Sequence, residues 1–151
     1  MSDSPEAPAT PYDQFRAGER HDDVFFFLHE DAVGAPDALQ HVAEDVGTGV
    51  VLVLPGDRGG EVFQKVTGLD PMEFAGVAMD TEGHIDASLT AGDCPSRDAD
   101  SHFVKFVFAF SEEENPEVGG IYAEGDVIHA YAACNCGTTY SDKWVVGERD
   151  D

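Results

Sequence analysis

The apolar residues near the amino terminus gather in two short continuous runs, VFFFL at residues 24–28 and VVLVL at residues 50–54. Runs of this kind are typical of strands that are buried on both faces of a sheet. Between them, apolar residues recur at helical spacing over residues 36–46. The segment begins with a proline, which suits the first position of a helix, and Gly47 follows its end. The pattern predicts a strand, a helix and a strand, a unit that favours two parallel strands joined by a right-handed crossover.

Two more helices are predicted downstream of the second run. Apolar residues at helical spacing indicate a helix over residues 61–66, which follows a glycine-rich loop at residues 55–60. Asp70 suits a helix N-cap, with a proline behind it and a glutamate three positions later, so a second helix is expected over residues 71–78. The apolar stretch at residues 74–79 also leaves a strand open.

The second half of the chain alternates short apolar segments with turn residues. We expect strands at residues 84–89, 102–110, 120–123, 127–133 and 140–146. Within residues 102–110, a period of two places Val104, Phe106, Phe108 and Phe110 on one face and Lys105 on the other. The predicted fold is α+β, with a mixed sheet that has an amino-terminal β-α-β unit, a mostly antiparallel second half and two or three helices on one face.

The length of 151 residues suits a single domain. Residues 1–20 hold three prolines and few large apolar side chains, so a disordered or extended arm is expected there. Residues 21–147 are expected to form one α+β domain, and residues 148–151 an acidic tail. The chain has neither a long apolar stretch nor a basic start like that of a signal peptide, and we therefore expect a cytoplasmic protein that does not enter a membrane.

The charge is strongly unbalanced, with 31 acidic against 8 basic residues and a net charge of −23. This balance excludes passive binding to nucleic acid or to an anionic membrane, because both need a basic surface. Asp outnumbers Glu by 18 to 13, and only 3 residues are Lys. Such usage is typical of proteins that fold in molar salt, where the Debye length falls to about 3 Å. The partners then expected are solvent cations, with a second copy or an unidentified protein left open.

The chain has three cysteines, Cys94, Cys134 and Cys136. An odd number in a chain of cytosolic character argues against a disulfide framework. The Cys-x-Cys pair offers two thiolates to a soft metal such as Zn²⁺ or Cu⁺. If the preceding strand continues, both sulfurs lie on one side and His129 on the other. Small buried thiols are the alternative, and a nucleophilic cysteine is a further one.

The glycine-rich loop is a second candidate site. Gly56, Gly59 and Gly60 follow a predicted strand and precede a predicted helix, where backbone N–H groups bind phosphate in α/β proteins. The loop lacks the Gly-Lys-Ser/Thr of a P-loop, and nearby carboxylates would repel an anion, which favours a tight connection instead. Histidines also adjoin acids near residues 21, 29, 84 and 102, without matching a catalytic motif.

The acidic composition, the length and the segment CNCGTTYSDKW resemble a small uncharacterised haloarchaeal family, a domain of unknown function. The resemblance implies a haloarchaeal origin, and it brings no established activity and no functional residue. The lack of a catalytic motif favours a non-enzymatic binding or assembly module without a cofactor. The alternative is a thiol-dependent metal protein for Zn or Cu, or a redox protein, that uses Cys134 and Cys136 together with Cys94. A hydrolase based on a histidine and an acid ranks third.

Overall fold

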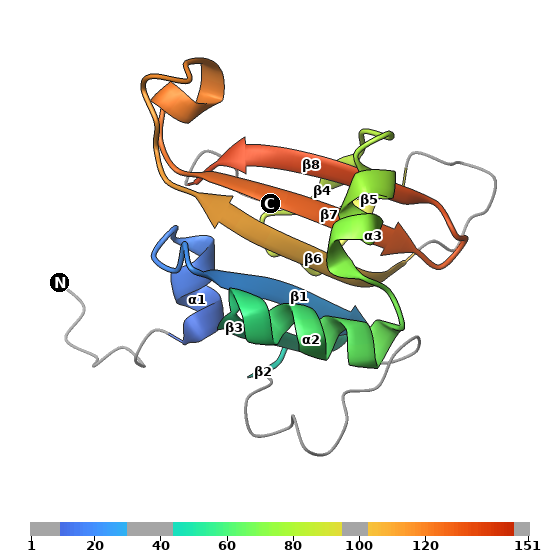
Figure 1. Cartoon of the computed structure of the whole chain (residues 1–151). Coiled ribbons are helices and arrows are strands. Elements are labelled where there is room, and N and C mark those ends of the chain that lie inside the picture. The colour runs from blue at the N-terminus through green and yellow to red at the C-terminus, as the bar shows by residue number, and fades with distance from the viewer. Residues whose placement is uncertain (1–9, 30–43, 95–102, 147–151) are drawn as a thin grey trace, which may run out of the picture.

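Six strands form the central sheet of the computed structural model, which describes residues 10–29, 44–94 and 103–146 (Figure 1). The strands are β1 (Asp23–His29), β2 (Glu44–Asp45), β3 (Gly49–Pro55), β6 (Val104–Glu112), β7 (Val127–Cys134) and β8 (Thr139–Val145). Their order across the sheet is β2-β3-β1-β6-β7-β8, and each pairing between them is antiparallel. The α+β class and the antiparallel second half are confirmed.

The expected parallel pair near the amino terminus is wrong. Strands β1 and β3 pair antiparallel, with Phe26 opposite Leu52. The predicted helix over residues 36–46 lies mostly outside the described residues, and its end forms β2 instead. Gly47 has a φ of 94°, and Val46 N–H donates to the carbonyl oxygen of Gly49 at 3.0 Å, so the chain reverses directly into β3. A continuous apolar run indicates that a strand is buried on both faces, and this is equally true of parallel and antiparallel strands.

One face of the sheet is covered by two helices, α2 (Gly56–Thr67) and α3 (Pro71–Ala78). Figure 1 shows α2 in front of β1 and β3 and α3 in front of β7 and β8. Phe63 of α2 lies at the centre of their shared core, with ring centroids 5.8 Å from Phe26 and 5.2 Å from Phe108. Helix α3 begins as predicted, because the Asp70 carboxylate accepts hydrogen bonds from two backbone N–H groups of the first turn.

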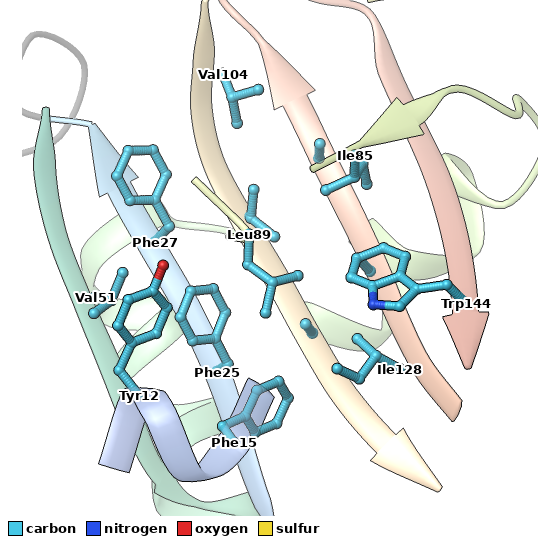
Figure 2. Close-up of a cluster of buried hydrophobic side chains, with 14 of the residues drawn as sticks. Tyr12, Phe15, Phe25, Phe27, Val51, Ile85, Leu89, Val104, Ile128 and Trp144 are labelled. Atoms are coloured by element: carbon cyan, nitrogen blue, oxygen red, sulfur yellow. The ribbon is translucent and has the colours of Figure 1, made fainter. Parts of the chain in front are cut away.

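The opposite face is covered by a third helix and a two-stranded ribbon. Helix α1 (Pro11–Arg16) stacks Tyr12 and Phe15 on Phe25, with ring centroids 5.7 and 5.6 Å apart (Figure 2). The ribbon consists of β4 (His84–Ile85) and β5 (Gly92–Asp93), and it buries Ile85 and Leu89 in the same core.

The expected arm is therefore wrong at residues 11–16, where Thr10 caps a helix that starts on a proline. Residues 1–9 and the expected tail at residues 148–151 lie outside the described part. The two predicted helices α2 and α3 share one face as expected, and α1 adds a helix to the other face.

Several boundaries differ from the sequence pattern. Helix α2 begins at Gly56, so the predicted loop forms its first turns. The predicted strand at residues 84–89 ends at Ile85, and residues 120–123 form the 3-10 helix η2 (Gly120–Ala123). A bulge at Lys105 places Val104 on the α1 side, opposite to Phe106 and Phe108. Among the described helices, none has the length and apolar character needed to cross a membrane.

Candidate metal-binding site

The three cysteines of the chain come together at one end of the sheet. Their sulfur atoms all lie within 4.8 Å of one another, and Cys94 Sγ is 3.8 Å from Cys136 Sγ. None of the three forms a disulfide. Within the described residues, no other group of potential metal ligands of this size gathers as closely. The structure therefore joins the Cys-x-Cys pair to the third cysteine, whose position the sequence pattern left open.

The hairpin between β7 and β8 positions two of the thiols. Cys134 ends β7 and, as the period of two predicted, faces the same core as Ile128, where it is only 1% exposed. Its N–H donates to the carbonyl oxygen of Thr138 at 2.8 Å and closes the turn. Gly137 supports this turn with a φ of 96°, which a side chain rarely tolerates. Cys136 lies within the turn and is exposed.

The ribbon of β4 and β5 delivers the third thiol. Cys94 directly follows β5 and is partly buried against the core that contains Cys134. Two hydrogen bonds fasten the ribbon to β8: Ile85 N–H donates to Asp142 Oδ2, and Gly83 N–H to the carbonyl oxygen of Ser141, both at 3.0 Å. The three sulfurs are thus held together by hydrogen bonds between two segments that are distant in the sequence.

The thiols differ in their protonation. Cys136 Sγ lies 3.3 Å from Thr138 Oγ1, and hydrogen bonds with the side chain and backbone of Thr138 lower the pKa of Cys136 to about 6. Burial raises the pKa of Cys134 to about 11. The exposed thiol is therefore mostly a thiolate at neutral pH, whereas the buried one keeps its proton until something displaces it.

A tyrosine missed by the sequence analysis lies beside the cysteines. Tyr140 of β8 is fully buried, and its hydroxyl has no hydrogen-bond partner among the described residues. Burial raises the pKa of Tyr140 above its usual range, and Cys134 and Cys94 add to the effect. The register of the hairpin could have revealed this residue, because Tyr140 pairs with Ala132 and so faces the same side as Cys134.

Three converging thiols suit a soft metal ion. Zinc forms bonds of about 2.3 Å to sulfur, so tetrahedral zinc holds its thiolates roughly 3.8 Å apart. The distance between Cys94 and Cys136 is 3.8 Å, and the third sulfur needs only a small shift. Three thiolates suit Cu⁺ as well, and they leave a position for a fourth ligand when the ion is Zn²⁺.

The glycines proposed for ligand binding lie elsewhere. Gly56, Gly59 and Gly60 form the start of α2, which covers the sheet face opposite to the core around Cys134. A Cβ atom on Gly59 would lie 2.2 Å from Val24 Cγ2, so this glycine is needed for the close packing of helix on sheet. The packing of the helix on the sheet therefore explains the glycine at position 59 without a ligand.

No described histidine joins the group of thiols, and His102 lies outside the described residues. His129 faces the side opposite to Cys134, as predicted, and its Nε2 lies 2.9 Å from Glu112 Oε1. Its ring stacks on Phe110 and Tyr122, at centroid distances of 5.0 and 6.0 Å.

His129 also borders an open groove of about 700 Å³, which is lined by Met79, Glu82, Gly83, His84, Tyr122, His129, Tyr131, Ser141, Asp142 and Lys143. Sequence reasoning did not find this groove, because its residues come from four separate segments.

Comparisons with known proteins give a family and no activity. Neither the curated proteins nor the solved structures provide a match to this chain. A sequence profile described as "Family of unknown function (DUF5807)" matches residues 43–147, which include the three cysteines and Tyr140. Because this match spans more than half of the 151 residues, the chain belongs to the DUF5807 family of unknown function.

Proposed function

We propose that this protein is a non-enzymatic binding protein whose ligand is a soft metal ion, Zn²⁺ or Cu⁺, held by Cys94, Cys134 and Cys136. The observation that carries the proposal is the convergence of all three sulfurs within 4.8 Å. It unites the two functions that the sequence favoured, a binding module and a thiol-dependent metal protein.

The surroundings of the thiols support binding of a cation. Hydrogen bonds that join the ribbon to β8 and close the hairpin turn hold the sulfurs near one another before any ion arrives. A prearranged set of ligands loses less conformational entropy on binding than a flexible one.

The proposal is tested by titrating the reduced full chain with Zn²⁺ or Cu⁺, anaerobically and in concentrated KCl, against a chelator of known affinity. We expect one ion per chain, and Co²⁺ used in place of Zn²⁺ should give sulfur-to-metal charge-transfer absorption. Replacing any one of the three cysteines with serine should weaken binding at least tenfold, since each removes a thiolate ligand.

The matched control is His129→Ala, because His129 lies on the opposite side of the sheet and should leave the affinity unchanged. The proposal is wrong if the wild-type chain binds no stoichiometric ion, or if the serine variants bind as tightly as the wild type.

A second candidate function is a thiol redox couple between Cys94 and Cys136, favoured by their 3.8 Å separation and the exposure of Cys136. A disulfide needs sulfurs about 2.05 Å apart, a short approach from this distance. With hydrogen peroxide as the oxidant, the Cys136 thiolate would attack an oxygen atom, give a sulfenic acid and release hydroxide. The Cys94 thiol would then displace that oxygen as water and form the disulfide.

The two functions separate at Cys134. Cys134→Ser should weaken metal binding at least tenfold and still permit peroxide to remove two hydrogen atoms from the Cys94 and Cys136 pair, as seen by mass spectrometry of the intact chain. Loss of that oxidation in Cys134→Ser would contradict the redox couple. Metal binding as tight as that of the wild type in the same variant would contradict the three-thiolate site.

The composition supports a proposal about the environment as well: a haloarchaeal cytoplasm with molar salt, where this acidic surface does not bind nucleic acid or anionic membranes. Self-repulsion at −23 is screened at high ionic strength. The free energy of unfolding should therefore rise with KCl concentration up to the molar range. Higher stability at low salt would contradict this environment.

A further inference from the structure

The buried hydroxyl of Tyr140 needs a physical explanation. Nearly all buried polar groups have hydrogen-bond partners, because a donor removed from water without one destabilises the fold. The Tyr140 hydroxyl has none among the described residues, although the side chain is 0% exposed. By contrast, the buried Tyr12 hydroxyl donates to the carbonyl oxygen of Ser88 at 2.5 Å.

The position of Tyr140 connects this unpartnered group to the thiols. Tyr140 and Cys134 belong to the same buried cluster, and Cys94 packs against it. The ribbon that carries Cys94 also confines the phenol ring. A Cβ atom on Gly92 would lie 2.8 Å from the Tyr140 hydroxyl oxygen, and one on Gly83 would lie 2.5 Å from Tyr140 Cδ2. The hydroxyl is therefore held between the β5 strand, which ends next to Cys94, and the strand face that carries Cys134.

We propose that Tyr140 is a positioning residue of the metal site, whose hydroxyl donates a hydrogen bond to a thiolate of the metal-loaded cysteines. The proposal rests on the metal-binding function proposed above, and it names a residue that acts through the ligands without contacting the ion.

A change in the acceptor would give the hydroxyl the partner that it lacks among the described residues. A thiol sulfur is a weak hydrogen-bond acceptor, whereas a thiolate carries a negative charge and accepts strongly. Metal binding requires deprotonated cysteines, so it turns the buried Cys134, which shares a cluster with Tyr140, from a thiol into a thiolate acceptor. Hydrogen bonds to metal ligands orient them and typically change metal affinity by about 10–100-fold.

The test compares Tyr140→Phe with Tyr12→Phe in the full chain. Tyr140→Phe should bind Zn²⁺ about tenfold or more weakly in chelator competition. In the metal-free state, its unfolding midpoint should equal or exceed that of the wild type, since the variant removes an unsatisfied buried group. Tyr12→Phe should show the reverse, with a lower metal-free midpoint and a Zn²⁺ affinity close to the wild type.

A spectroscopic measurement keeps the inference separate from a loss of packing. In the ultraviolet resonance Raman spectrum, adding Zn²⁺ to the wild type should shift a tyrosine band toward that of a hydrogen-bond donor, and Tyr140→Phe should lack this shift. The inference is overturned if Tyr140→Phe binds Zn²⁺ like the wild type, if no tyrosine band responds, or if the variant is destabilised without metal. Failure of the wild type to bind any ion would instead overturn the metal-binding function itself.

Discussion

Cys94 Sγ and Cys136 Sγ lie 3.8 Å apart, although 42 positions separate the two residues in the sequence. The contact depends on the ribbon of β4 and β5, which crosses to β8 and places Cys94 against the hairpin turn. The third thiol is buried beneath them, and its protonation differs from that of Cys136. These differences allow each cysteine to be examined separately by its chemistry.

Cys136 should be the reactive thiol. Because hydrogen bonds from Thr138 lower the pKa of Cys136 to about 6, its thiolate fraction should rise through pH 6 and level off near pH 7. Alkylation by iodoacetamide in the metal-free chain should follow this profile, with Cys134 unmodified because burial raises its pKa to about 11. Thr138→Val should shift the Cys136 profile to higher pH. A wild-type profile that rises only near pH 9 would contradict the stabilised thiolate.

Gly83 should be intolerant of a side chain. A Cβ atom there would lie 2.5 Å from Cδ2 of the buried Tyr140 ring, so Gly83→Ala should lower the free energy of unfolding by about 1–3 kcal/mol through overpacking. Denaturant unfolding of the metal-free chain measures the change. Gly76→Ala is the matched control, since Gly76 is exposed in α3 with open space around it, and alanine should stabilise that helix by roughly 0.5–1 kcal/mol. Equal effects of the two substitutions would contradict the packing described for Tyr140.

Phe63 should be the most costly side chain to truncate on the helix-covered face. It is fully buried, with its ring near those of Phe26, Phe74, Phe106 and Phe108. Phe63→Ala should lower the free energy of unfolding by about 3–5 kcal/mol, through lost transfer energy and the cavity left behind. Met72→Ala provides the comparison, because Met72 is 70% exposed and should change stability by less than about 0.5 kcal/mol.

His129 should titrate below its ordinary range. Burial lowers the pKa of His129, and the Glu112 carboxylate at 2.9 Å partly opposes that effect. Glu112→Gln should therefore lower the His129 pKa further, as measured by the pH dependence of its imidazole NMR signals. Because the folded state binds this proton more weakly than the unfolded chain, His129 should make folding less favourable as the pH falls through about 6.5. A higher pKa in Glu112→Gln would contradict the pairing.

The apolar pattern identified the main strands because burial determines it directly. Residues 24–28 and 50–54 form the interior of β1 and β3, and the capping residues at Asp70 located α3. Strand direction was not available from the same pattern, since a strand buried on both faces reads alike in parallel and antiparallel sheets. Val104 was assigned to the wrong face because a bulge inverts the alternation and leaves no periodic signal.

The candidate site was only partly accessible from the sequence, for a related reason. Cys134 could be placed because it continues the alternation of β7, and its orientation toward the Ile128 side followed from that. The position of Cys94 depends on hydrogen bonds from backbone N–H groups at the ribbon to β8, which the pattern of apolar residues does not encode. Tyr140 depends on the exact register of a hairpin, which is fixed by the length of its turn.

The joining of the ribbon to the hairpin has a consequence for the unfolded chain. An ion shared by Cys94 and Cys134 would close a loop of about 40 residues. If the unfolded chain kept the ion bound, a crosslink of that span would raise the free energy of the unfolded state by roughly 4 kcal/mol, because it lowers the conformational entropy of that state. That closed loop contains β6, the strand that joins the two halves of the sheet between β1 and β7. Bound metal would therefore link segments on both sides of the central strand, so that the free energy of unfolding increases with metal occupancy.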